Sequence, residues 1–390
     1  MRNLSQSIMS LKQSGIRRMQ ALALSIPDAI HLEIGEPDFP TPAHIVEAAH
    51  AAALDGFTKY TVGAGLPSVR EAVSEKLARR NGLAVPPEQV VVTTGSAGAL
   101  ATVFRVLLDP GDEVLLPVPG WANYVSVVNC AYGTPRFYRL DPANDFEPDL
   151  ASLDQLVSPR TKAILINSPS NPTGAVLSRA AIEGLVAFAS RHDLYVVSDE
   201  VYEDCVFDGD LVSPMGLIDE PRFIGIYSVS KSYAMTGWRV GYVAAPAHVA
   251  PPLAKLQEPY VASTCAVSQK AAEAALRGPQ ACIEEMRRAY HRRRDLAVAL
   301  LAEYGVPHFV PRGAFYVMVD TTGAHPDSDA FCEALLLERH VALCPGTAFG
   351  EVAAGWVRVS LATAEPLLME GLGRMAAFTR ERSAQTVLVS

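Results

Sequence analysis

Short, nearly continuous apolar runs recur along the chain from about residue 88 onward. Six of them are rich in β-branched and aromatic residues: QVVVTT (89–94), EVLLP (113–117), KAILIN (162–167), LYVVSD (194–199), FIGIYSVS (223–230) and WRVGYVAA (238–245). Strands that are buried on both faces show such runs, whereas strands with one wet face alternate apolar and polar residues. The pattern therefore predicts six strands of a sheet that is covered on both sides.

Helical patterns separate most of these runs. Apolar residues recur every three or four positions in AGALATVFRVLL (97–108) and RAAIEGLVAFASRH (179–192). Alternating strands and helices are typical of a mainly parallel, doubly wound α/β sheet. The run WRVGYVAA follows FIGIYSVS too closely for a helical crossover, so we expect this one pair to be antiparallel.

The C-terminal part has a different pattern. Residues 279–303 predict one long helix, and GAFYVMVD and GWVRVSLA are the clearest strands after it. The arginines of this helix could form a nucleic-acid patch, but Glu284 and Glu285 precede Arg288 by one turn, which favours a solvated, salt-bridged face. We expect a large domain over residues 45–283 and a smaller α+β domain formed by residues 1–44 with 284–390.

Composition narrows the class of protein. The chain has 390 residues, is 49% hydrophobic and 19% charged, and carries a net charge of −9. These values are those of a globular protein with a sizeable core, and the negative charge argues against general binding to nucleic acid or membranes. The start of the chain lacks the apolar region of a signal peptide, so we expect a cytoplasmic protein.

Cysteines and histidines give no sign of a metal centre. The six cysteines form no C-x-x-C pair, and the nine histidines show no paired-ligand spacing. We therefore expect reduced thiols and no bound metal.

Candidate chemistry begins at Lys231, which directly follows a predicted strand and is surrounded by serines and small residues, with Arg239 eight positions later. Sites in open α/β sheets form beyond the carboxyl ends of strands. A lysine at such a place can act as a nucleophile if cationic or apolar neighbours lower its pKa. Taken alone, the residue fits an exposed loop lysine somewhat better than a nucleophile.

Four other strand ends carry notable residues. Asp199 and Tyr202 follow LYVV, where a carboxylate suits a buried cationic ring nitrogen but could also be a helix N-cap. Asn171 lies in the rigid turn NSPSNPTGA (167–175), and TTGSAGAL (93–100) has a strand–turn–helix form that can bind phosphate through backbone N–H groups. Trp121 could stack on a planar ring, although a core position is common for tryptophan.

These motifs occur in one order along the chain, and together they resemble the class I/II aminotransferases, which are fold-type-I pyridoxal-phosphate enzymes. The likeness covers nearly the whole length and is strongest to the bacterial aspartate and aromatic aminotransferases. It rests on six segments: IGEPDFPTP (34–42), KYTVGAGLPSVREA (59–72), SPSNPTGA, SDEVYED, SVSKSYAMTGWRVGY and GWVRVSLA. The resemblance implies a mainly parallel seven-stranded sheet and a smaller α+β domain.

The resemblance also implies roles for individual residues. Lys231 matches the lysine that holds pyridoxal 5'-phosphate as an internal aldimine and then moves the substrate proton. Asp199 matches the partner of the ring nitrogen, Tyr202 and Asn171 match donors to the cofactor 3-oxygen, and Trp121 matches the stacking aromatic. The expected phosphate ligands are Gly95, Ser96, Ala97, Ser228 and Arg239.

Substrate and partner residues follow in the same way. Arg358 matches the arginine that binds the substrate α-carboxylate, and the backbone of Gly35 matches part of the same pocket, together with Trp121 and Asn171. Tyr60 matches a tyrosine that reaches the phosphate in the neighbouring subunit, which implies a homodimer with shared sites. Arg105 either faces the entrance and binds a second carboxylate or points outward.

The resemblance implies ping-pong transfer of an α-amino group from an L-amino acid to a 2-oxo acid. Other reactions of the same fold and cofactor, such as β-lyase, cyclase, decarboxylase or oxidase chemistry, would use the same residues. A sensor that lacks catalysis would need an attached DNA-binding domain; because the matched segments begin near residue 1, we do not expect one. The sequence does not name the donor, the acceptor or the pathway.

Overall fold

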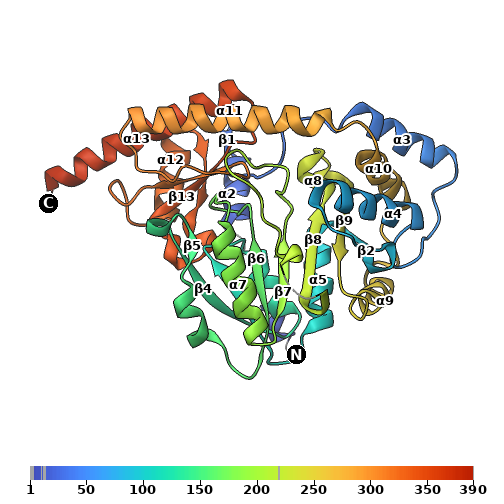
Figure 1. Ribbon diagram of the computed structural model, residues 1–390. Coiled ribbons are helices and arrows are strands. Elements are labelled where there is room, and N and C mark those ends of the chain that lie inside the picture. The colour runs from blue at the N-terminus through green and yellow to red at the C-terminus, as the bar shows by residue number, and fades with distance from the viewer. Residues whose placement is uncertain (1–3, 10, 12–14, 218–219, 390) are drawn as a thin grey trace.

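The computed structural model describes residues 4–9, 11, 15–217 and 220–389. Its main feature is an eight-stranded sheet with the order β2-β9-β8-β7-β6-β3-β4-β5 (Figure 1). The strands are β2 (Val90–Thr93), β3 (Glu113–Val118), β4 (Thr134–Asp141), β5 (Glu147–Pro148), β6 (Thr161–Asn167), β7 (Tyr195–Asp199), β8 (Phe223–Ser228) and β9 (Gly241–Ala244).

The strand directions follow the expected pattern. The neighbours among β4, β3, β6, β7 and β8 pair in parallel, and β9 runs antiparallel to both β8 and β2. All six predicted strands are present, and the antiparallel step from β8 to β9 is confirmed. The expected number of seven strands is one too few, because the two-residue strand β5 pairs with the outer end of β4 and is too short to leave an apolar run.

Both faces of this sheet are buried, as the apolar runs predict. In β6, Ile164 and Ile166 pack with helix α7 on one face, whereas Ala163 and Leu165 pack with α5 on the other. The helices of this part are α3 (Ala43–Leu54), α4 (Pro67–Lys76), α5 (Gly95–Leu107), α6 (Asn123–Cys130), α7 (Arg179–Arg191), α8 (Val229–Ser232), α9 (Ala250–Val261) and α10 (Ala266–Arg277).

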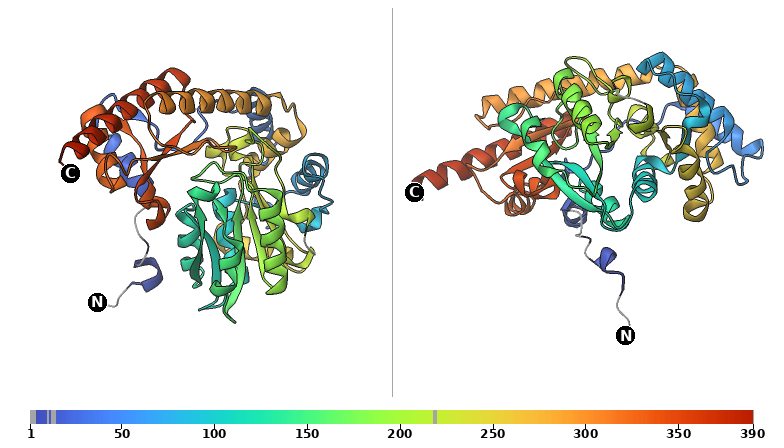
Figure 2. Two further views of the ribbon diagram at one scale, coloured as in Figure 1. Left: turned by 60° about the vertical axis from the view of Figure 1, so that its left-hand side comes forward. Right: turned by 60° about the horizontal axis from the view of Figure 1, so that its bottom comes forward.

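A smaller α+β part joins the two ends of the chain. The antiparallel strands β10 (Tyr316–Asp320), β13 (Trp356–Ser360) and β12 (Cys344–Pro345) form one sheet, and β1 (Ile30–His31) pairs in parallel with β11 (Val341–Ala342). Its helices are α1 (Gln6–Met9), α2 (Gly15–Ala23), α11 (Ala281–Glu303), α12 (Ser328–Arg339) and α13 (Glu365–Val389). Figure 2 shows α11 and α13 side by side over this part, with the C-terminal turns of α13 projecting from the body.

The long helix α11 spans the two parts. Ile283 packs into the core beside the large sheet, whereas Met286 and Tyr290 pack into the core of the smaller part. This change of core coincides with the expected domain boundary between residues 283 and 284, and the two domains remain a prediction. Some residues assigned to these domains lie outside the described chain: 1–3, 10, 12–14, 218–219 and 390. Within the described chain, no helix combines the length and apolar character that a membrane span needs.

Candidate active site

The strand ends bring the predicted residues to one edge of the large sheet. β2, β3, β6, β7 and β8 run in the same direction, so their carboxyl ends meet there. The residues that follow these strands include Gly95, Trp121, Asn171, Asp199 and Lys231. The edge therefore collects an acid, an amide, an aromatic ring and an amine from distant parts of the sequence.

Asp199 is the last residue of β7 and is 2% exposed. Its Oδ2 accepts a hydrogen bond of 2.8 Å from the Tyr124 hydroxyl, and its Oδ1 accepts one of 3.3 Å from the Val201 backbone N–H. Burial raises the pKa of this carboxyl to about 6, although these neutral donors and Lys231 oppose the rise. The site thus contains a buried carboxylate to which a cationic ligand atom would be attracted.

Lys231 lies in the short helix α8, and its Nζ donates a hydrogen bond of 2.6 Å to the Gly35 carbonyl. The rings of Tyr202 and Phe315 have their centroids 5.9 and 5.7 Å from the same nitrogen. Burial, with smaller contributions from Arg358 and Arg239, lowers the pKa of Lys231 to about 8, although Glu36 opposes the change. At pH 7 about a tenth of such amines are neutral and can act as nucleophiles.

The turn after β2 is shaped for close approach. Gly95 opens α5 at a φ of 70°, and the N-cap residue Thr94 makes no side-chain cap hydrogen bond. A Cβ on Gly95 would lie 2.3 Å from Nη2 of Arg239, so the exposed guanidinium packs directly on this turn. Backbone N–H groups of Ser96 and Ala97 in the first helical turn and this cation together make a surface for an anion.

Ser228 is buried and serves as the N-cap of α8. Its Oγ accepts from the Ser230 backbone N–H at 3.1 Å and hydrogen-bonds Ser230 Oγ at 2.9 Å. The structure thus adds a second buried hydroxyl, Ser230, that the sequence analysis missed. Its only sequence signal is its place in the Ser-Val-Ser-Lys segment.

Arg358 lies on β13 and is 1% exposed. Its Nη1 donates to Asn171 Oδ1 at 2.8 Å and its Nη2 donates to the Glu33 carbonyl at 2.5 Å. The guanidinium carbon lies 4.3 Å from the ring centroid of Tyr316 and 4.9 Å from that of Phe349, and Nε is buried with no hydrogen-bond partner. The cation is fixed in position, but its hydrogen-bonding capacity is not used up.

Four aromatic residues complete the cluster. Tyr202 and Tyr316 share a hydrogen bond of 2.8 Å between their hydroxyls, and half-buried Trp121 meets Tyr124 edge to face, with centroids 5.5 Å apart. Tyr124 and Tyr316 were missed by the sequence analysis. Tyr124 stands three residues after Trp121 in PVPGWANY, which is the only signal that could have pointed to it.

Two predicted residues lie apart from this cluster. Arg105 is exposed in the last turn of α5, about 15 Å along the helix from Gly95, and its guanidinium lies 5.8 Å from the ring centroid of Tyr132. Its exposure and its contact with Tyr132 fit the outward-facing alternative, and the contact with a second substrate carboxylate stays a prediction. Tyr60 is 89% exposed on the surface of the chain.

A second buried carboxylate, Glu200, follows Asp199 but belongs to a different cluster. It is 1% exposed, accepts a 2.7 Å hydrogen bond from Ser213 Oγ, and leaves Oε2 without a partner. Burial, followed by the nearby charge of Glu203, raises its pKa to about 7. Because this folded-state pKa is above the unfolded value, ionisation of Glu200 destabilises the fold as pH rises from about 4.5 to about 7.

We expect Glu200→Gln to become more stable relative to the parent protein as pH rises. The free energy of unfolding should shift in favour of the variant by up to about 3 kcal/mol between pH 5 and pH 8. Urea unfolding at the two pH values measures the shift. Glu183→Gln, which removes an exposed ion pair with Arg179, is the control and should show no comparable change. A pH-independent difference for Glu200→Gln would contradict the assignment.

Comparison with known proteins now identifies this constellation. Residues 27–372 match the family described as aminotransferase class I and II. The chain belongs to this family. Members of the aminotransferase class I and II family use pyridoxal phosphate, and the chain is accordingly a pyridoxal-phosphate-dependent aminotransferase that moves an α-amino group from an amino acid to a 2-oxo acid. The expected family, fold class, cofactor and reaction type are confirmed, and the match to named aminotransferases favours transamination over the other reactions of this fold.

Relatives within the family cover nearly the whole chain. The aspartate/prephenate aminotransferase of Thermus thermophilus is 41% identical over 96% of this chain and 98% of its own. The aromatic-amino-acid aminotransferase 2 of Thermococcus litoralis is 39% identical over 97% and 99%. The solved structure of the Thermus thermophilus aspartate aminotransferase with maleate superposes with a TM-score of 0.93 at 40% identity, covering 97% of this chain and 100% of that one.

Proposed function

We propose that the residues at this edge of the sheet hold pyridoxal phosphate and the substrate carboxylate in the roles that the family resemblance implies. The observation that carries the proposal is the pair formed by the buried Asp199 and the partly buried Lys231. Burial raises the pKa of the Asp199 carboxyl and lowers the pKa of the Lys231 amine. Such shifts suit an acid that faces a cationic ring and an amine that bonds to a carbonyl carbon. Groups perturbed in opposite directions within one cleft are typical of active sites.

The other residues fit the cofactor in size and chemistry. The buried Asp199 carboxylate would stay ionised beside a protonated ring nitrogen, and Tyr124 would hold it in place. Asn171 accepts from Arg358 through Oδ1, which leaves its amide N–H₂ to donate to a phenolic oxygen. Tyr202 lies beside the same space, and Trp121 would cover a ring face. Gly95, Ser96, Ala97, Ser228 and Arg239 would bind the phosphate.

The chain's own part in the reaction is acid–base work and orientation. Bound pyridoxal phosphate supplies the electron sink that makes the substrate Cα–H acidic. Lys231 would hold the cofactor covalently in the absence of substrate, and its amine, once free, would take the proton from the substrate Cα. Arg358 binds the α-carboxylate, with Gly35, Trp121 and Asn171 lining the pocket, and so presents the Cα–H bond to the Lys231 amine.

The names of the relatives support a proposal for the substrates. The Thermus relatives act on aspartate and prephenate by name, and the Thermococcus relative acts on aromatic amino acids. We propose donors of the aspartate and aromatic groups with 2-oxo acid acceptors. The cytoplasm is the proposed location, supported by six cysteines that are all free thiols.

A spectral titration tests the function directly. The purified protein is mixed with single L-amino acids without any oxo acid, and absorbance is recorded from about 300 to about 550 nm. We expect one group of donors to convert the cofactor to its amino form, and a 2-oxo acid to reverse the change. Ammonia release, oxygen uptake, or the absence of any cofactor band would contradict the proposed transamination or the role of Lys231.

We further propose a homodimer in which each subunit completes the other's site. Tyr60 is 89% exposed, and Leu54, Val62 and Tyr260 are 75%, 58% and 52% exposed. Such large apolar side chains on the outside of one chain suit an interface. The Tyr60 hydroxyl would then donate to the phosphate in the partner's site.

A hybrid dimer tests this arrangement. Tyr60→Ala is expected to weaken cofactor binding about 10-fold, because one hydrogen bond to a charged group is lost. A dimer of one Tyr60→Ala subunit and one Lys231→Ala subunit should regain half of the parent activity with parent cofactor affinity, since one site then holds both intact residues. If Tyr60 acts in its own subunit, the hybrid will show no such recovery.

A further inference from the structure

One short segment contacts both reactive cations of the site. Residues 33–41, here called the strap, connect β1 to helix α3. The Glu33 carbonyl accepts from Arg358 at 2.5 Å, and the Gly35 carbonyl accepts from Lys231 at 2.6 Å. Arg358 belongs to the small sheet, and Lys231 follows a strand of the large sheet. The two carbonyls of the strap therefore link these two cations through hydrogen bonds.

The C-terminal end of the strap is attached to the loop after Lys231. Thr41 Oγ1 donates to the Ala234 carbonyl at 2.7 Å and accepts from Trp238 Nε1 at 3.0 Å. Thr236 Oγ1 also hydrogen-bonds Glu36 of the strap. One threonine hydroxyl thereby uses both its donor and its acceptor capacity to hold the strap beside the lysine loop.

The middle of the strap is attached to the small sheet by Asp38. Its carboxylate forms two hydrogen bonds of 2.8 Å with the Arg293 guanidinium, a bidentate pair. The Arg293 side chain is 8% exposed and also donates to the Leu361 carbonyl at 3.1 Å, three residues beyond Arg358. Arg293, on helix α11, thus joins the strap to the residue that directly follows β13, the strand that carries Arg358.

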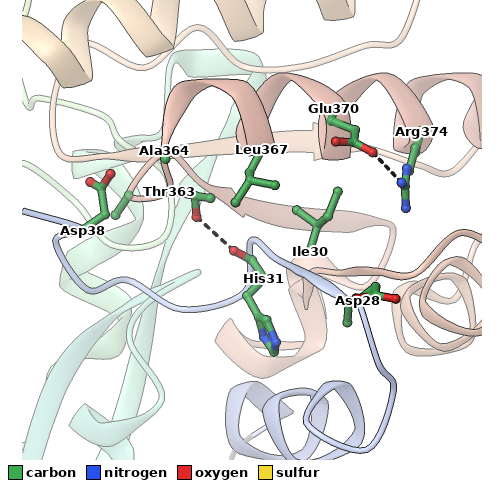
Figure 3. A pocket seen from close by; sticks show the side chains of 11 residues that line it. Asp28, Ile30, His31, Asp38, Thr363, Ala364, Leu367, Glu370 and Arg374 are labelled. Carbon is green, nitrogen blue, oxygen red and sulfur yellow. Dashed lines mark hydrogen bonds and ion pairs between the residues drawn. The ribbon is translucent and has the colours of Figure 1, made fainter.

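The two sides of the strap are packed differently. On the inner side, a Cβ on Gly35 would lie 1.8 Å from the Tyr316 hydroxyl, so backbone and phenol are in direct contact. On the outer side lies an open cavity of about 520 Å³ that His31, Asp38, Thr363 and Leu367 help to line (Figure 3). Asp38 is the strap residue that borders this cavity, whereas Phe39 packs edge to face on Tyr290, with ring centroids 5.7 Å apart. The polar anchors at Asp38 and Thr41 therefore add to the packing of Phe39 in holding the strap.

We infer that Asp38 is a positioning residue for substrate binding: its ion pair with Arg293 fixes the strap so that Arg358 is presented to the substrate carboxylate at the correct distance from Lys231. The inference rests on the roles proposed above for Arg358 and Lys231. Asp38 itself is paired with Arg293 and is not among the residues proposed to touch substrate or cofactor. A displacement of about 1 Å in such a site can cost about 100-fold in rate.

The test compares Asp38→Asn with Glu365→Gln in the holoenzyme. Glu365 pairs with Arg292, the neighbour of Arg293 on α11, at 2.9 Å, but that pair is exposed and does not touch the strap. For Asp38→Asn we expect KM for both the amino acid and the 2-oxo acid to rise about 10-fold or more. The dissociation constant of the donor's 2-methyl analogue, which binds without turnover, should rise equally, while cofactor affinity stays within about twofold. Glu365→Gln should leave all of these constants unchanged.

Two further variants separate the possible outcomes. Asp38→Glu keeps the charge and should retain most of the affinity, and Thr41→Val, which removes the second anchor, should weaken the analogue in the same direction. If Asp38→Asn only lowers Tm and leaves KM and analogue binding unchanged, the ion pair is merely structural and the inference is wrong. Arg358→Lys is the check on the proposed function: if it leaves analogue binding unchanged, the assignment of Arg358 fails, whatever Asp38 does.

Discussion

Replacing Lys231 by alanine is expected to lower kcat by about four orders of magnitude. The change would remove both the group proposed to bond to the cofactor and the base proposed to move the substrate proton. Cofactor should still bind without a covalent bond, since Asp199, Asn171 and Arg239 remain in place. Steady-state transamination measures the loss, and borohydride reduction followed by mass spectrometry locates the modified lysine.

The control for this prediction is a different lysine, one that forms an ion pair away from the site. Lys270 lies 2.5 Å from Glu273 on helix α10, and Lys270→Ala should retain parent kcat. Reduction should label Lys231 in the parent protein and no lysine in Lys231→Ala. An added small primary amine is expected to restore part of the activity, because it can replace the missing base. Retention of more than about a tenth of kcat in Lys231→Ala, or labelling at another lysine, would overturn the assignment.

Strand ends are the part of this site that sequence reasoning predicts well. A strand buried on both faces leaves a continuous apolar run, and the first polar residue after it lies at the carboxyl edge of the sheet. Asp199 and Lys231 could be placed in this way, and the family resemblance then added roles for Arg358 and Asn171. The fold class followed from the same runs, while the two-residue strand β5 left no trace in the pattern.

Contacts between distant segments could not be predicted in the same way. The bond between Tyr124 and Asp199 spans 75 residues, and the bond between Arg358 and the Glu33 carbonyl spans 325. No local periodicity encodes such pairs, because they depend on how the two parts of the chain pack together. Arg105 on helix α5 is a similar case. Its position in the helical pattern did not predict whether its side chain faces the site entrance or the outer surface.

Asp199→Asn is expected to reduce kcat by about two to three orders of magnitude while leaving the fold intact. The carboxylate at the end of β7 is buried among neutral donors, and burial sets its pKa at about 6 in the ligand-free protein. Above that pH it is charged and, in the role proposed for it, would stabilise a proton on the cofactor ring nitrogen. Asparagine has nearly the same shape but no charge, so the ring would lose its proton and withdraw electrons less strongly.

The pH dependence of cofactor binding gives this prediction a second readout. In the parent apoprotein, affinity should fall as pH decreases through about 6, since protonation of Asp199 removes its attraction for a cationic ring. The cofactor phosphate also titrates near pH 6, but that step is common to all variants. The difference between the parent protein and Asp199→Asn therefore isolates the carboxylate, and it should vanish at low pH.

Glu200→Gln is the matched control for this comparison, since Glu200 is the adjacent buried carboxylate and faces Ser213 rather than the cleft. It should keep kcat within about threefold of the parent and retain the parent's pH dependence of cofactor binding. If Glu200→Gln lost activity as strongly as Asp199→Asn, the effect would reflect general disturbance of a buried acidic segment. If neither variant changed the pH dependence, Asp199 would not be the partner of the ring nitrogen. Only a loss confined to Asp199→Asn supports a charge held at the end of β7 for the cofactor.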